Sequence, residues 1–204
     1  MQWLVLGLIL FLGMHSVRIV ADDWRSQMID RIGLGAWKAL YSLVSLLGLV
    51  LIVWGYGLAR HNPVTLWVPP VGMAHAASLL TLLAFVLLVA AYIPGNAIKA
   101  RLQHPMVLGV KLWAFAHLLA NGAMADVLLF GGFLAWAVLD YRSARRRPAG
   151  QPDDDDDDAA DVAEVRGARS ALAPTVATVV VGVGAWAVFA FWAHGALFGV
   201  RPFG

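Results

Sequence analysis

Long runs of apolar residues, separated by short polar stretches, dominate the pattern along this chain of 204 residues. A helix needs about 20 largely apolar residues to cross the hydrocarbon core of a membrane. Five or six stretches approach that length, so the pattern predicts an all-α, polytopic transmembrane bundle of about six helices. The expected helices cover roughly residues 2–20, 37–58, 71–93, 106–119, 125–139 and 173–195.

Turn signals separate several of these stretches. Pro69-Pro70 marks the start of the third helix, and Asn121-Gly122 joins the short fourth and fifth helices. We interpret that pair as a tight helical hairpin, with one long bent helix as the alternative. The first stretch has no Lys or Arg before its apolar run and no small-residue cleavage site, so we expect a retained helix rather than a signal peptide.

Composition supports a membrane protein and excludes several classes of site. The chain is 60% apolar and 14% charged, whereas soluble domains average about 25% charged residues. It has no cysteine, which excludes disulfides, iron–sulfur clusters and Cys-ligated zinc. The formal charge of +2 is too small to indicate a nucleic-acid partner. The expected partner is the lipid bilayer, and the expected localisation is the cell inner membrane, as a multi-pass protein.

The distribution of basic residues predicts the topology, because Lys and Arg concentrate on the cytoplasmic side. With the N-terminus and the C-terminus outside, twelve basic residues fall inside and two outside; the reverse orientation inverts that ratio. Lys111, about one turn inside the fourth helix, can snorkel inward. The inner residues are Arg18, Arg25, Arg31, Lys38, Lys99, Arg101, Arg142, Arg145, Arg146, Arg147, Arg166 and Arg169, and the outer ones are Arg60 and Arg201.

One long hydrophilic stretch interrupts the apolar pattern and contains Asp153 through Asp158. Six successive carboxylates repel one another, so we expect a disordered cytoplasmic loop. A calcium site is the alternative, but rigid sites space their ligands along a turn. The chain therefore divides into a membrane domain of five helices over residues 1–142, the Asp-rich loop over 143–171, and a C-terminal helix with a short tail over 172–204.

Histidines are the main candidates for chemistry, because ionisable side chains inside a membrane are costly unless they have partners. His15 lies in the first expected helix, with Phe11 one turn before it. His117 lies in the fourth, where Trp113 and Asn121 stand four residues before and after it. His104 precedes Pro105 at the mouth of the same helix.

Three interpretations of these histidines fit the spacing. Two histidines on different helices can supply both axial ligands of a haem, which would be b-type because the chain has no CxxCH motif. They could instead serve another metal or a proton relay, or be structural residues that donate to neighbouring helices. The residues alone do not decide between these interpretations.

The chain from Gln103 to Ala137 resembles the NnrU family of integral membrane proteins. The pattern comprises a His-Pro step, a Trp four residues before a His, an Asn-Gly turn and a Leu-Phe-Gly helix, here Phe130-Gly131. The Gly13-Met14-His15-Ser16 step matches as well, and the resemblance covers about residues 1–142.

The resemblance implies a haem b site and a link with nitric oxide and denitrification. The family is similar to 15-cis-zeta-carotene isomerase, whose two haem ligands match His15 and His117. That enzyme has a Cys, an alternative ligand on reduction, where this chain has Ala114, and the family's Arg before His-Pro is Gln103 here.

These points lead to one expected function and two alternatives. We expect haem iron held by His15 and His117, with Trp113 and Asn121 lining the site and His104 as the alternative ligand. The expected role is redox or sensing, with a membrane redox partner. The alternatives are a haem-dependent isoprenoid isomerase, with a hydrophobic isoprenoid substrate, and a non-haem transporter or accessory subunit.

Overall fold

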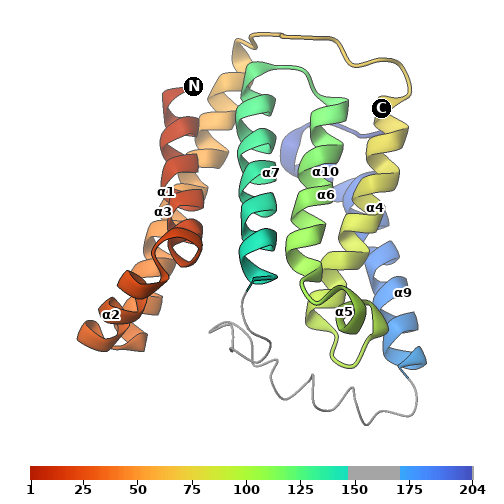
Figure 1. The fold of residues 1–204 in the computed structure, drawn as a ribbon. Helices are drawn as coiled ribbons and strands as arrows, with labels where there is room; N and C mark the ends of the chain where they lie inside the picture. The colour runs from red at the N-terminus through yellow and green to blue at the C-terminus, as the bar shows by residue number, and fades with distance from the viewer. Residues whose placement is uncertain (147–170, 204) are drawn as a thin grey trace. The chain divides into compact units, whose positions relative to one another are not determined.

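A computed structural model describes residues 1–146 and 171–203 of the chain. Its regular elements are helical throughout this part (Figure 1), which confirms the all-α fold class. The tract Asp153–Asp158 lies outside the described residues, as does most of the expected loop over 143–171, so the domain division stays a prediction. The helices are α1 (Gln2–Val20), α2 (Asp22–Ile32), α3 (Leu34–His61), α4 (Met73–Tyr92), α5 (Ala97–Leu102), α6 (Pro105–Ala120), α7 (Met124–Ala144), α9 (Leu172–Val188), the π-helix η1 (Phe189–Ala193) and α10 (His194–Phe198).

Five helical segments in the described residues are long and apolar enough to cross a membrane. The fourth expected helix, α6, has 16 residues and spans about 24 Å, short of the roughly 30 Å of a hydrocarbon core. Large apolar side chains on these helices face outward, such as Leu43, which is 67% exposed. This exposure is expected where lipid, rather than water, surrounds the helices. The five spans are Gln2–Val20, Leu34–His61, Met73–Tyr92, Met124–Ala144 and Leu172–Phe198.

Two short helices, α2 and α5, lie where the apolar pattern predicts only loops. Asp22 in the first turn of α2 and Arg31 in its last turn complement the helix dipole. Gly33, with a φ of 84°, ends the helix. The ring of Trp24 packs edge-on against Trp37 of α3, at 5.9 Å between ring centroids.

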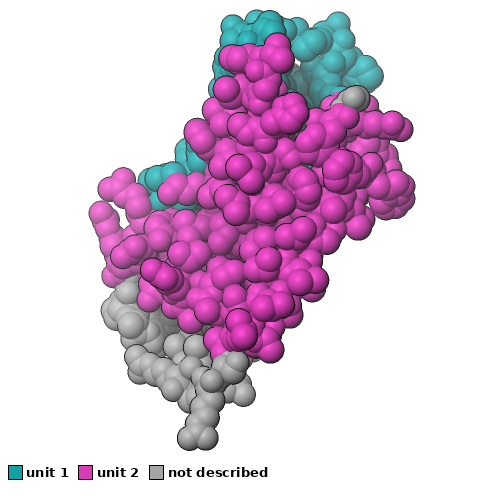
Figure 2. All heavy atoms as spheres, turned by 90° about the vertical axis from the view of Figure 1, so that its right-hand side faces the viewer, with its two compact units in different colours: residues 1–69, 121–140 teal, residues 70–120, 141–204 magenta. Residues whose placement is uncertain are grey.

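Contacts divide the described residues into two compact units, drawn in teal and magenta in Figure 2. Unit 1 comprises residues 1–69 and 121–140, and unit 2 comprises the described residues of 70–120 and 141–204.

Unit 1 is built on the packing of α1 against α3, which lie side by side (Figure 1). Small residues allow the two backbones to approach closely. A Cβ atom on Gly55 would lie 2.3 Å from the backbone nitrogen of Leu4, and one on Gly48 would lie 2.7 Å from that of Phe11. The glycines of α3 therefore determine how closely α1 packs.

The connection after α3 pairs with the turn at Asn121-Gly122, where the sequence predicts a break between helices. The helices indeed end at Ala120 and begin again at Met124. The Leu66 amide donates to the Gly122 carbonyl at 2.8 Å, and the Met124 amide donates to the Val64 carbonyl at 2.8 Å. These bonds tie the start of α7 to the chain that follows α3.

Unit 2 is built on α4, which packs against both α6 and α9. Ala84 of α4 has no exposed surface, and a Cβ on Gly109 of α6 would lie 3.1 Å from its carbonyl oxygen. Asn96 has no exposed surface either; its side chain donates to the Ala90 carbonyl at 2.9 Å and accepts from the Lys99 amide at 2.8 Å. Asn96 thereby caps α5 and connects it to the end of α4.

Candidate functional site

His15 lies in α1 with its ring orientation fixed by the helix backbone. Its Nδ1 lies 2.7 Å from the carbonyl oxygen of Phe11, one turn earlier. A carbonyl oxygen can only accept, so Nδ1 carries the proton and Nε2 carries the lone pair. Histidines that ligate metals commonly donate their other ring N–H to a carbonyl in this way.

Aromatic rings from three helices surround His15 in unit 1. Phe11 of α1 stacks on it at 4.2 Å between centroids, Tyr41 of α3 lies at 5.2 Å, and Trp136 of α7 meets it edge-on at 5.9 Å. The sequence placed Phe11 beside His15 through its helical spacing. Tyr41 and Trp136 come from helices distant along the chain and carried no such signal.

Trp136 Nε1 and Ser45 Oγ are among the polar atoms of the same unit that are buried without a hydrogen-bond partner among the described residues. Trp136 packs against His15, and Ser45 stands one turn after Tyr41 on α3. A buried N–H donor without a partner is unfavourable unless another group accepts from it. Aromatic rings therefore surround His15, and one of them, Trp136, carries a buried N–H donor that has no partner among the described residues.

His117 has the same backbone relation in unit 2. Its Nδ1 lies 2.8 Å from the carbonyl oxygen of Trp113, so Nε2 again carries the lone pair. The Trp113 ring lies 5.1 Å from the His117 ring. The predicted proximity of Trp113 and His117 is confirmed.

The four residues expected at the haem site divide between the two units. His117 and Trp113 belong to unit 2, whereas His15 and Asn121 belong to unit 1. Asn121 follows the last residue of α6, Ala120, and does not extend its helical face. The structure brings Trp113 to His117 but does not bring His15 and His117 together within one unit, so the ligand pair stays a prediction.

The other histidines have separate surroundings. His104, the alternative ligand, precedes α6, and its ring meets Tyr141 edge-on at 6.3 Å. His61 and His75 are exposed, and His194 Nδ1 donates to the Val200 carbonyl at 2.7 Å. Within the described residues no three His, Asp or Glu side chains gather as a metal site.

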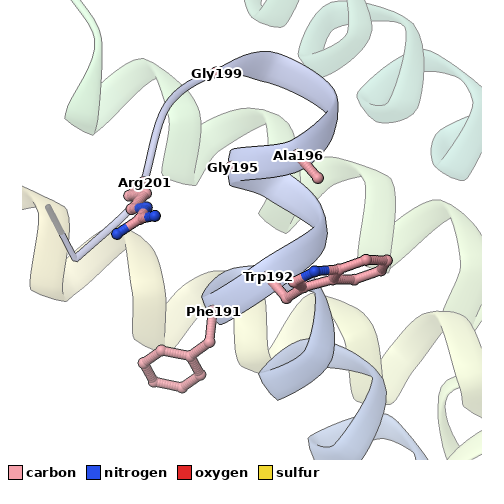
Figure 3. Close-up of a pocket in the computed structure, with 6 residues that line it drawn as sticks. All are labelled: Phe191, Trp192, Gly195, Ala196, Gly199 and Arg201. Carbon is pink, nitrogen blue, oxygen red and sulfur yellow. The ribbon is translucent and has the colours of Figure 1, made fainter.

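A pocket of about 430 Å³ opens at the C-terminal end of unit 2. The rings of Phe191 and Trp192 project to different sides of the π-helical turn, and Arg201 lies on the segment that follows (Figure 3). Its remaining lining residues are Gly195, Ala196 and Gly199. None of the residues expected at the haem site lines it.

Asp126 is a buried acidic residue whose surroundings the sequence did not indicate. It lies in the first turn of α7, and only 8% of its surface is exposed. Its Oδ1 accepts from the Tyr56 hydroxyl at 2.6 Å, and its Oδ2 accepts from the Ala123 amide at 3.0 Å. The second bond resembles half of a capping box and is readable from the sequence; the bond to Tyr56 is not.

Comparison with family models identifies the family of the chain. The model described as NnrU protein matches residues 3–202. The chain belongs to the NnrU family. The match extends past residue 142, so the C-terminal helix, expected outside the resemblance, falls within the NnrU match. No curated protein and no solved structure matches the chain.

Proposed function

We propose that this NnrU protein binds haem b through His15 and His117 and has a redox or sensing role in the inner membrane. The observation that carries the proposal is the shared geometry of the two rings. Each donates from Nδ1 to the carbonyl four residues earlier, at 2.7 and 2.8 Å. Each therefore presents the Nε2 lone pair, the atom that an iron-binding imidazole needs.

The surroundings of both histidines suit a flat, apolar, aromatic cofactor. Phe11, Tyr41 and Trp136 supply rings around His15, and Trp113 supplies one beside His117. The buried Trp136 Nε1 is a donor that a polar edge of the cofactor could accept from. When bound, haem b supplies a one-electron redox couple.

The proposed ligation favours electron transfer or gated sensing over direct catalysis. If both histidines held the iron, an external ligand such as nitric oxide would have to replace one of them. The resemblance to NnrU proteins connects such a role with nitric oxide and denitrification. Ala114, where the related isomerase has a Cys, is fully buried and has no ligand atom, so isoprenoid isomerisation by ligand exchange is the less supported alternative.

Visible absorption of the purified protein tests the cofactor. We expect a Soret band that shifts on reduction, and a colourless protein from haem-sufficient cells would contradict the proposal. His15→Ala and His117→Ala should each reduce the haem content per folded protein to a small fraction, because each removes a side chain that would hold the iron. Added imidazole should restore binding to either variant by filling the cavity left by the ring.

Two further variants assign the ligands. His61→Ala changes an exposed residue at the end of α3 and should leave haem content unchanged. His104→Ala separates the two candidate ligand pairs. If it abolishes haem binding while His117→Ala does not, the ligand is the His-Pro histidine and the assignment of His117 is wrong. Size-exclusion profiles confirm that each variant is folded.

A further inference from the structure

Two basic side chains and a histidine converge on one tyrosine ring in unit 2. Lys111 of α6 places its Nζ 5.3 Å from the centroid of the Tyr141 ring. The guanidinium carbon of Arg145 lies 5.9 Å from the same centroid, and the His104 ring meets it edge-on at 6.3 Å. We call Lys111, Arg145, Tyr141 and His104 the Tyr141 cluster.

The two permanent charges of the cluster, on Lys111 and Arg145, both lie near the same ring. Both distances are measured to one centroid, so the charges lie at most the sum of the two distances apart, about 11 Å. Cation–π contacts offset part of their mutual repulsion. Neither side chain has a carboxylate partner within the described residues. An anion between them would be attracted by both.

The N-terminus of α6 adds to this positive potential. The helix begins at Pro105, directly after His104, so the positive end of its dipole lies beside the cluster. Asp140, the closest acidic residue along the chain, stands about 100° around α7 from Tyr141. The cluster is also accessible, because Arg145 is exposed and Lys111, Tyr141 and His104 are only half-buried.

The position of the cluster along the helices indicates that it lies at the depth of the lipid headgroups. Tyr141 lies in the last turn of α7, a helix long enough to cross a membrane. Tyrosines at such helix ends sit at the membrane–water interface. Lys111 starts deeper, in the second turn of the short helix α6, and its long stem reaches to the Tyr141 ring.

We propose that the Tyr141 cluster binds the phosphate of an anionic glycerophospholipid such as phosphatidylglycerol. Lys111 and Arg145 flank the phosphodiester, and the Tyr141 hydroxyl is available as a hydrogen-bond donor. An anionic headgroup fits better than phosphatidylcholine, whose own ammonium group would be repelled by the two cations. This proposal does not rest on haem binding.

Native mass spectrometry of the full chain in detergent tests the site. Dioleoylphosphatidylglycerol and dioleoylphosphatidylcholine are titrated into the wild type and into Lys111→Gln/Arg145→Gln. We expect the wild type to prefer phosphatidylglycerol, and the double variant to lose that preference by roughly tenfold. Arg145→Gln alone changes an exposed residue just after α7. It should lose part of the preference, and it serves as the test if the double variant does not fold.

A matched control separates a site from general electrostatic attraction. Arg31→Gln/Arg142→Gln removes the same two charges from exposed positions outside the cluster and should keep the preference within about twofold. Equal losses in both double variants, or no loss in either, would overturn the proposal. So would displacement of the lipid by millimolar inorganic phosphate, because the occupant would then be a free anion.

Discussion

At the scale of single residues, the most informative positions were ionisable side chains within apolar segments. His15 and His117 could be selected from the sequence because the cost of burying an unpaired imidazole in lipid is independent of fold detail. Their Nδ1 bonds to Phe11 and Trp113 follow from helical spacing alone. Tyr41 and Trp136 could not be selected, because ring contacts between helices depend on packing that no local pattern encodes.

The bond between Tyr56 and Asp126 yields a prediction at this scale. Tyr56→Phe removes a hydroxyl that donates to a buried carboxyl oxygen at 2.6 Å and leaves the ring in place. We expect a loss of about 1–3 kcal/mol in the free energy of unfolding, because Asp126 Oδ1 keeps no equivalent donor. Unfolding in detergent micelles measures the change.

Tyr92→Phe is the matched control for that measurement. Tyr92 is 74% exposed at the end of α4, so the same chemical change should alter stability by no more than about 0.5 kcal/mol. Equal effects of the two substitutions would show that the Tyr56 bond contributes nothing specific.

At the scale of helices, apolar length predicted the spanning elements well. The first helix was expected over residues 2–20 and is observed over Gln2–Val20. The helices α2 and α5 were missed, because neither is apolar and each depends on its ends: charged residues and Gly33 for α2, and the Asn96 cap for α5. The break at Asn121-Gly122 was predictable because Asn-Gly is a turn signal. The structure adds a close approach of two backbones there, since a Cβ on Gly122 would lie 2.0 Å from the Trp67 carbonyl oxygen.

The packing of α1 against α3 can be tested with two glycines of one helix. Gly55→Ala places a methyl group against the backbone of Leu4, which no side-chain rotation can relieve. We expect the free energy of unfolding to fall by roughly 1–3 kcal/mol. Gly57→Ala meets nothing within 4 Å and should be neutral or stabilise by up to about 1 kcal/mol.

Thermal unfolding of the two variants under the same detergent conditions separates the effect of close backbone packing from the effect of helix propensity. Both glycines lie within α3, so the gain in helix propensity is the same for the two variants. They differ in packing, because Gly55 is buried whereas Gly57 is exposed. If Gly57→Ala destabilises as much as Gly55→Ala, close backbone approach does not explain the role of Gly55.

At the scale of the whole molecule, composition and apolar length were sufficient for the fold class. An all-α membrane protein follows because a spanning chain must satisfy its backbone hydrogen bonds internally. The grouping into two units could not be foreseen, since α7 contributes residues to both: 121–140 belong to unit 1 and Tyr141 begins the next segment of unit 2. Helix pairing of this kind depends on contacts between distant residues.

The orientation in the membrane is the last prediction. Twelve of the basic residues face the cytoplasm if both termini lie outside, and two face it otherwise, leaving Lys111 aside. A reporter enzyme active only outside the cytoplasm should therefore work when fused after Arg201 and fail when fused within Asp153–Asp158. A second reporter, active only inside, should give the complementary result and excludes loss of expression as the cause of a negative signal. The opposite pattern would refute the charge argument and would place the Tyr141 cluster at the outer leaflet, because Arg145 and the Asp tract follow α7 on the same side of the membrane.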